Sequence, residues 1–375
     1  MTASSVTLSP PSSRPLGSDR WIALVILLGL FAFSPVASHG VILFRTADVT
    51  ANTTVPTNDP AGSGWNYEGQ FGGFLATAIA PHFIITAKHI GIAPLFTYAG
   101  IHYHVVGYFP DPASDLAIFQ IQETLPTYAP LYSGLGEVGQ RIVAIGRGTQ
   151  RGAEYILNGN LRGWLWGPGD GVTRWGENVV GSIVPYGTDN ELLRAPFDQN
   201  GLSDECHLSS GDSGGAAFLN DNGTWKLAGI HFAVDDFYSD ENGGGKFTGA
   251  LFDIRGLWTP NDAPPPAYVQ FSGPEPVPSG FYPTRISRRL PWICSVVAAP
   301  VMGREGNFLT LTYTKLAVTP DITYVVEQST DLNTWGPAAT TDEVLPSSGS
   351  AQTIKAKVDV TGIPVLFLRL RTTRP

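Results

Sequence analysis

Short apolar runs separated by turn residues recur along the chain, and this feature restricts its fold more than any other. The runs are 40–44, 74–80, 83–87, 102–109, 116–121 and 141–146. Each is too short for a typical helix, and turn-forming residues stand between them. The sequence holds 43 Gly and 30 Pro, so turns are plentiful, and no long helical period interrupts the region. The pattern predicts an all-β chain, whose strands are broken by Gly-rich segments at 158–175.

Two later segments extend this prediction. The run Asp221-Asn222-Gly223 lies between apolar segments, and Asn-Gly readily adopts the positive φ angles of a tight hairpin turn. Within 354–360, Ile, Ala and Val alternate with Lys and Asp, which is typical of a half-buried strand. The segment 366–371 alternates in the same way. We therefore expect a small second β domain over 301–375.

The N-terminus has the pattern of an export signal. Arg14 and Arg20 precede an apolar stretch over 21–33, and Val36-Ala37-Ser38 offers small residues for cleavage. The stretch is short for a membrane span. We expect 1–38 to be a signal peptide and the mature chain to be secreted, periplasmic or at the cell surface. An uncleaved membrane anchor is the alternative.

Charge and cysteine content exclude some partners. The formal net charge is −9 and the sequence has no long basic run, so no nucleic-acid partner is expected. Cys206 and Cys294 are the two cysteines, and they either form one disulfide or stay free. Neither belongs to a metal-ligand pattern, and we expect no metal and no cofactor.

Three short motifs carry nucleophilic chemistry. His89 ends an apolar strand, Asp115 opens another, and Ser213 lies in the Gly-rich run Gly211–Gly215. Taken singly, each has a structural explanation as a surface histidine, a turn aspartate or a tight glycine turn. Together, in the order His, Asp, Ser, they indicate a catalytic triad.

On these residues the chain resembles the chymotrypsin/trypsin family of serine peptidases. The run Thr86–His89 matches the family's histidine motif, with Lys88 where Ala is usual, and Asp115–Ala117 matches its aspartate motif. Gly211–Gly215 matches its serine motif without a change. The resemblance implies a two-barrel peptidase domain. It also implies that His89 is the general base, Asp115 its orienting acid and Ser213 the nucleophile.

The resemblance assigns further roles within the serine loop. The backbone amides of Gly211 and Ser213 would form the oxyanion hole. In this family the aspartate at the position of Asp212 accepts a new N-terminal ammonium on activation. No Ile-Val-type activation sequence precedes His89 at the usual distance, so the partner of Asp212 stays open.

Resemblance resumes after the Pro-rich stretch 260–278. The segments 280–285 and 290–293 are similar to the family's closing strand and C-terminal helix. Apolar residues at spacings of three and four over 286–297 independently predict that helix, which should start close before Pro291. We therefore expect a peptidase domain over 39–300 with a long insertion at 232–279. The alternative is a linker followed by a separate domain over 280–375.

Substrate preference is predicted from three positions. In the family the base of the primary pocket is set by the residue at the position of His207, so without a carboxylate there we expect no strong preference for Lys or Arg. His231 matches a position where glutamate-specific relatives carry histidine, and Gly280 opens the closing strand beside the pocket. We expect His231 to be a buried strand residue and the pocket to take small or apolar groups. The alternative is that the two imidazoles bind an acidic side chain.

The sequence thus predicts an exported serine endopeptidase acting on protein or peptide substrates through an acyl-enzyme. A catalytically inactive binding protein of the same fold and a serine esterase are the alternatives. The tail motif 323–335 resembles small β-sandwich modules of exported bacterial proteins, which implies attachment to a surface, binding of polysaccharide or protection of the chain. The sequence does not determine the oligomeric state.

Overall fold

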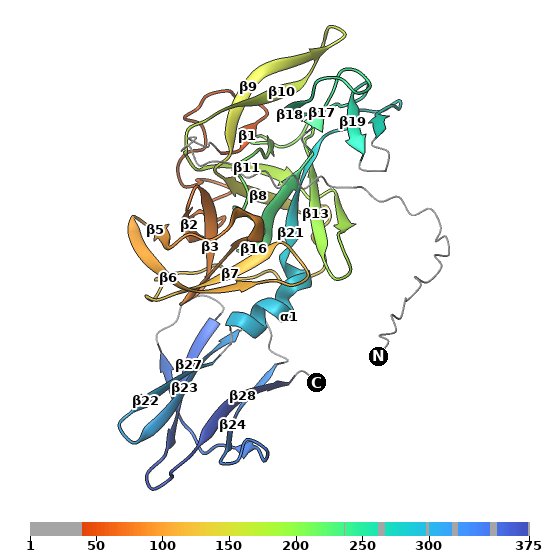
Figure 1. Cartoon of the computed structure of the whole chain (residues 1–375). Coiled ribbons are helices and arrows are strands. Elements are labelled where there is room, and N and C mark those ends of the chain that lie inside the picture. Colours follow the sequence, from red (N-terminus) through yellow and green to blue (C-terminus); the bar gives the residue numbers. More distant parts are fainter. Residues whose placement is uncertain are drawn as a thin grey trace, which may run out of the picture.

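The computed structural model describes residues 40–235, 237–261, 267–297, 300–316, 322–345 and 351–373 (Figure 1). The predicted signal peptide over 1–38 lies outside these residues. Within the described ranges, no helix is long and apolar enough to cross a membrane.

The first half of the chain closes into a six-stranded barrel. Its strands, in spatial order, are β2 (Glu68–Phe71), β3 (Phe74–Ala80), β4 (Phe83–Ala87), β7 (Leu116–Ile121), β6 (Ile101–Pro110) and β5 (Leu95–Tyr98). The predicted runs at 74–80, 83–87 and 116–121 coincide with β3, β4 and β7. All five residues of β4 are buried, as expected for a strand covered on both faces.

The second half forms a seven-stranded sheet that curls into a second, barrel-like body. Its order is β11 (Arg174–Val179), β8 (Arg141–Gly146), β15 (Ala216–Asp221), β16 (Thr224–Val234), β21 (Gly280–Arg285), β13 (Glu191–Pro196) and β12 (Ser182–Pro185). Beyond the end of β11, the amide of Gly181 donates to the carbonyl oxygen of Arg194 at 2.8 Å, which brings this edge back to β13. The predicted hairpin is confirmed, because Asn222 and Gly223 have φ values of 52° and 88° between β15 and β16.

One prediction about this region is wrong. The Gly-rich segment 158–175 does not interrupt the strands, since β10 (Asn160–Gly169) runs through it and pairs with β9 (Thr149–Leu157). A Cβ on Gly163 would lie 2.2 Å from the carbonyl oxygen of Ala250. The glycine therefore permits close approach of the neighbouring strand rather than a turn.

The expected insertion is built as two strands that extend the β9–β10 hairpin and two that pair with each other in a separate sheet. It contains β17 (Phe237–Tyr238), β18 (Phe247–Leu251), β19 (Trp258–Asn261) and β20 (Ala267–Gln270), and the sheet order is β17-β18-β10-β9. The insertion begins later than position 232, because β16 continues to Val234. It leaves at Asp235, whose amide donates to the carbonyl oxygen of Gly280 at 2.8 Å, so its two ends meet.

Helix α1 (Ile286–Val297) follows the closing strand directly, as the periodicity predicts. Ile286, Leu290, Ile293 and Val297 are buried and belong to the same core as residues of both barrels. Pro291 lies in the second turn, further from the helix start than expected. The helix thus packs against the two-barrel body with one apolar face.

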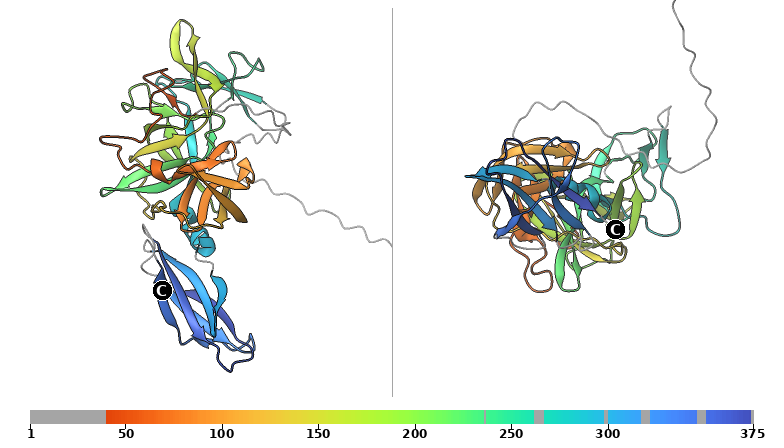
Figure 2. Two further views of the ribbon diagram at one scale, coloured as in Figure 1. Left: turned by 90° about the vertical axis from the view of Figure 1, so that its left-hand side faces the viewer. Right: turned by 90° about the horizontal axis from the view of Figure 1, so that it is seen from below.

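The C-terminal segment forms two further sheets, seen below the barrels in Figure 1 and in the turned view of Figure 2. One has the order β22 (Val301–Glu305), β23 (Phe308–Leu316), β27 (Ala351–Asp359) and β26 (Thr341–Leu345); the other is β25 (Gly336–Pro337), β24 (Thr323–Ser329) and β28 (Phe367–Thr373). Ile354, Ala356 and Val358 are buried on one face of β27, as the alternation predicts. A separate small core of Leu311, Tyr313, Val326, Ile354 and Ala356 joins the two sheets.

The predicted fold class is therefore confirmed: two barrel-like sheets and a single α-helix among the described residues precede a small β-sandwich-like segment. The domain boundary near Pro300 stays a prediction. Cys206 and Cys294 are buried and do not form a disulfide. The short strands β1 (Ile42–Leu43) and β14 (Cys206–His207) pair with each other at the start of the serine loop.

Candidate active site

His89 and Asp115 are brought together by the pairing of two strands. Ala87, the last residue of β4, pairs with Leu116, the first residue of β7, so the residues just outside each strand become neighbours. A single 3-10 turn, η2 (Lys88–Ile90), then carries His89. Its Nδ1 lies 2.6 Å from Oδ2 of Asp115, and its backbone amide donates to Oδ1 at 3.1 Å. These two bonds orient the imidazole, and its other nitrogen points away from Asp115.

Ser213 belongs to the second barrel and approaches Nε2, the other nitrogen of His89. Its Oγ lies 2.8 Å from Nε2 of His89. Gly214, which follows, has φ +79°, and a Cβ there would lie 2.2 Å from Oγ1 of Thr86 and 2.7 Å from the carbonyl oxygen of Leu75. Only glycine fits this backbone between the serine loop and the first barrel. The three side chains of the predicted triad thus form one hydrogen-bonded series across both barrels.

The serine loop also presents backbone donors. Gly211 has φ +97°, which its lack of a Cβ permits. Within the described part of the chain, no acceptor receives the backbone amide of Gly211 or of Ser213. Unengaged amides beside a nucleophile are the groups that stabilise a developing oxyanion.

Asp212 is buried beneath this loop and has a full set of donors. Oδ1 accepts from the amides of Gly148 at 2.6 Å and Val41 at 3.2 Å. Oδ2 accepts from the amide and hydroxyl of Ser209 at 2.7 and 3.2 Å. Burial raises the pKa of Asp212 to about 7, although these hydrogen bonds oppose the rise.

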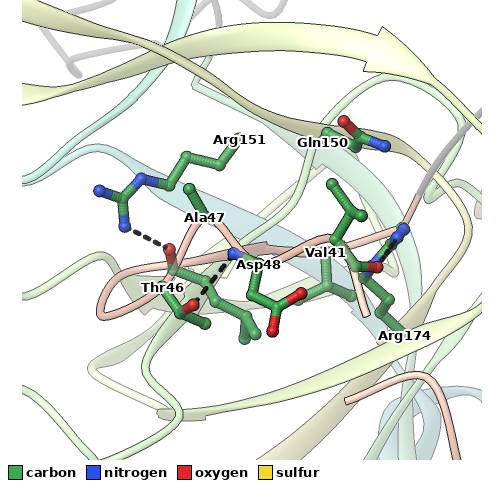
Figure 3. Close-up of a pocket in the computed structure, with 10 residues that line it drawn as sticks. Val41, Thr46, Ala47, Asp48, Gln150, Arg151 and Arg174 are labelled. Carbon is green, nitrogen blue, oxygen red and sulfur yellow. Dashed lines mark hydrogen bonds between the residues drawn. The ribbon is translucent and has the colours of Figure 1, made fainter. Parts of the chain in front are cut away.

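Asp212, whose partner the sequence left open, is therefore held by donors from three segments: Ser209 in its own loop, Gly148 after β8, and Val41 near the start of the described residues. The segment around Val41 lies against the second barrel. Arg174 donates to the carbonyl oxygen of Val49 and Arg151 donates to that of Leu43 at 3.4 Å (Figure 3), and Arg151 also donates to that of Phe44 at 2.6 Å. A cavity of about 20 Å³ lies among these residues.

Lys88, the departure from the histidine motif, fastens the aspartate loop to His89. Its Nζ donates to the carbonyl oxygens of Asp111 at 2.8 Å and Ser114 at 2.6 Å, and its amide donates to that of Asp115 at 2.7 Å. From helix α1, Arg289 reaches the same loop and donates through Nε and Nη2 to the two carboxylate oxygens of Asp111 at 2.7 and 2.6 Å. Two elements, η2 and helix α1, therefore hold the loop that ends in Asp115.

The residues predicted to line the primary pocket are enclosed by side chains. The His207 ring is fully buried between Phe197 and Phe281, with centroid distances of 5.6 and 6.2 Å, and its Nδ1 lies 2.6 Å from the carbonyl oxygen of Leu208. His231 is also buried and lies edge-on to Phe281 at 5.9 Å. Burial lowers the pKa of His207 to about 4 and that of His231 to about 3.

Gly280 likewise takes part in the barrel rather than in an open recess. Its amide donates to Oδ2 of Asp235 at 2.9 Å, and a Cβ there would lie 2.9 Å from the carbonyl oxygen of Ala195. The structure thus places His207 and His231 around one phenyl ring. Both imidazoles are neutral over most of the pH range because burial disfavours the charged form.

An aromatic pair beside the triad escaped the sequence prediction. The Phe232 ring lies edge-on to the His89 ring at 6.0 Å and contacts Tyr186 at 5.2 Å. Phe232 follows His231 in β16, where alternation turns its side chain towards the opposite face. Phe232 therefore packs beside the imidazole, and Tyr186 packs against Phe232.

Comparison with known proteins adds little at the level of sequence. No protein-family model matches the chain, and no curated protein matches it. Among solved structures it is similar to neuropsin, a serine protease expressed in the limbic system of mouse brain. The two share 16% identity over 63% of this chain and 96% of the neuropsin chain, with a TM-score of 0.40. A likeness at this level assigns no activity.

Proposed function

We propose that this chain is a serine endopeptidase that cleaves peptide bonds through an acyl-enzyme. The observation that carries the proposal is the unbroken series from Asp115 through His89 to Ser213, at 2.6 and 2.8 Å. Charge on Asp115 favours the tautomer of His89 whose Nδ1 carries the proton. Nε2 is then free to accept the proton of the serine hydroxyl.

The chemical steps use these groups in turn. As Ser213 Oγ bonds to the substrate carbonyl carbon, its proton passes to Nε2 of His89, and the amides of Gly211 and Ser213 receive the oxyanion. The imidazolium then gives that proton to the leaving amine, and the acyl-enzyme forms as the C–N bond breaks. Water, deprotonated by the same nitrogen, releases the acyl group and restores the serine.

Two alternatives make different demands. An inactive binding protein needs neither the tautomer-fixing bonds of Asp115 nor the unengaged amides of the serine loop. An α/β-hydrolase-type esterase carries its triad in the order Ser, acid, His on a parallel sheet, whereas the ladders of both barrels here are antiparallel. We further propose, from the sequence pattern at 1–38 and 323–335, that the peptidase is exported and that its tail binds a surface or polysaccharide.

Ser213 supplies the direct test. Purified protein should react with a fluorophosphonate at one serine and should cleave casein. Ser213→Ala should abolish labelling and lower proteolysis by several orders of magnitude, because only binding and the oxyanion donors remain. His89→Ala should do comparable damage.

The exposed Ser133 provides the matched control, since Ser133→Ala removes an equivalent hydroxyl far from the triad motifs. Near wild-type cleavage by Ser213→Ala would refute the assignment. A protein that folds but neither labels nor cleaves would identify the inactive binding protein. Turnover of simple esters without any turnover of casein would identify the esterase.

A further inference from the structure

A cavity of about 280 Å³ opens between the two barrels. Its walls include Glu68, Gln70 and Leu75 from the first barrel and Arg147, which follows β8 in the second. The volume is below the usual range for a drug-sized ligand and suits a single side chain.

Both walls touch residues that flank the candidate nucleophile. On one side, the carbonyl oxygen of Leu75 approaches Gly214 so closely that a Cβ there would lie 2.7 Å away. On the other side, Gly148, next to Arg147, donates its amide to Asp212 at 2.6 Å. A peptide held at Ser213 therefore passes within reach of this cavity.

Arg147 supplies an unsatisfied positive charge. Its Nε and Nη1 donate to the carbonyl oxygens of Gly171 at 2.8 Å and Gly73 at 3.2 Å, which are neutral acceptors. Burial lowers the pKa of Arg147, and the nearby Asp170 only partly opposes this. Asp170 is itself engaged by Arg174 at 2.8 Å. An anion entering the cavity would relieve the burial of this guanidinium.

Arg147 differs in this from three other arginines of the second barrel, whereas Arg151, like Arg147, donates to carbonyl oxygens. Arg141, Arg174 and Arg285 each form a direct ion pair with a carboxylate. No such pair is present for Arg147 within the described residues. Its charge is thus available to a ligand.

Glu68 does not cancel that charge. Its Oε1 accepts from the Thr77 hydroxyl at 2.6 Å, while Oε2 is buried and has no partner among the described residues. Burial raises the pKa of Glu68 to about 8, so near neutral pH the carboxyl mostly keeps its proton. It then offers a hydrogen-bond donor.

We propose that this cavity is a substrate subsite that binds an acidic side chain close to the scissile bond, with Arg147 as the residue that selects it. The proposal rests on the proposed peptidase function. It assigns substrate preference to the interface between the barrels, away from the buried rings of His207 and His231.

The test uses the full-length protein and fluorogenic peptides. A peptide library first identifies the preferred residue before the cleaved bond, and that residue is then held constant. Asp, Asn, Leu and Lys are next exchanged at each of the three positions on either side. One position should favour Asp over Asn about ten- to a hundredfold in kcat/KM, the range that a hydrogen bond to a charged group supports.

Single substitutions test which residue causes the preference for Asp over Asn. Arg147→Gln should reduce it to near unity, whereas Glu68→Gln should keep it, because the amide remains a neutral donor. Arg45→Gln, an exposed arginine in the N-terminal segment, is the matched control and should keep it.

Three outcomes would refute the proposal that this cavity is a subsite for an acidic side chain. They are cleavage without an acidic preference at any position, an acidic preference that survives Arg147→Gln, and a preference for Lys that Glu68→Gln abolishes. Failure of the proposed function looks different, since wild-type protein would then cleave none of the peptides and would not label with fluorophosphonate.

Discussion

Arg289→Met should destabilise the two-barrel body by about 3–5 kcal/mol, because it leaves a buried carboxylate without its counter-charge. Asp111 has no exposed side-chain surface, and only 12% of the Arg289 side chain is exposed. Two nearly parallel bonds at 2.7 and 2.6 Å join them, and Ser114 donates to the same carboxylate at 2.5 Å. Without the guanidinium, the buried carboxylate keeps only the Ala113 amide and the Ser114 hydroxyl as donors, so most of its desolvation cost is no longer offset.

The neighbouring Arg288 provides a matched control on the same helix. Its Nη2 lies 3.4 Å from Oδ1 of Asp189, and the two side chains are 47% and 67% exposed. Surface pairs of this kind contribute about 0–1 kcal/mol. Guanidinium chloride unfolding at pH 7 should therefore show a much lower midpoint for Arg289→Met than for Arg288→Met, with similar m values.

The effect should also depend on pH and reach the active site. Burial opposes ionisation of Asp111, but the bonds from Arg289 and Ser114 outweigh it and lower its pKa below the usual value. The pair thus stabilises the fold above the unfolded-state pKa of about 3.9, and this stabilisation is lost as pH falls through the folded value. For that reason, the difference in free energy of unfolding between Arg289→Met and Arg288→Met should become smaller below about pH 4.

Because the loop of Asp111 ends in Asp115, kcat should fall in Arg289→Met even where the protein stays folded. The reasoning would be refuted if Arg289→Met and Arg288→Met unfolded within about 1 kcal/mol of each other at pH 7, the worth of an exposed pair.

Three further predictions concern other parts of the molecule. Glu68→Gln should flatten the pH dependence of the free energy of unfolding between about pH 5 and 8. The pKa of Glu68 in the folded protein, about 8, exceeds its unfolded value, so the stability of the wild-type protein falls as pH rises through that window; equal slopes in the two proteins would contradict this. A chain ending near Pro300 should fold and cleave peptides, whereas one ending near Pro260 should not, because the shorter chain lacks β21 and α1. Circular dichroism measures the folding and a peptide assay the cleavage; activity in the shorter chain would be the contrary result. Rates on matched Glu, Leu, Ala and Arg substrates should show no preference for Arg, and any preference for Glu should survive His231→Ala, because that ring is buried against Phe281; a preference for Arg, or one for Glu that this variant abolishes, would be the contrary result.

Much of the fold followed from local patterns. The strands at β3, β4 and β7, the Asn222-Gly223 turn and helix α1 each depend on residues close together in the sequence, so periodicity and turn chemistry sufficed. The path of β10 could not be predicted in this way, because its glycines allow close contact with strands distant in the sequence. A pattern rule interprets such glycines as turns and cannot detect the neighbour that requires them.

The candidate site shows the same division. Three motifs identified the residues that the structure joins at 2.6 and 2.8 Å. The roles of Lys88 and Arg289 depend on a loop and a helix that meet only in three dimensions. His207 and His231 were assigned to a pocket by position, yet their rings pack on Phe281, whose burial no local pattern reveals.

The meeting of Asp235 with Gly280 has a consequence for folding kinetics and for variation of the chain. The amide of Asp235 donates to the carbonyl oxygen of Gly280, and that of Gly280 donates to the Asp235 carboxylate, so the intervening segment closes a loop whose ends are already tied. Each doubling of a loop's length costs only about 0.6 kcal/mol of closure entropy. The β16–β21 ladder can therefore form before the inserted strands are ordered. Changes in the length of 236–279 therefore cost little in closure entropy, but they must keep Ala250 and Phe252, which pack in one core with Trp164 and Phe197.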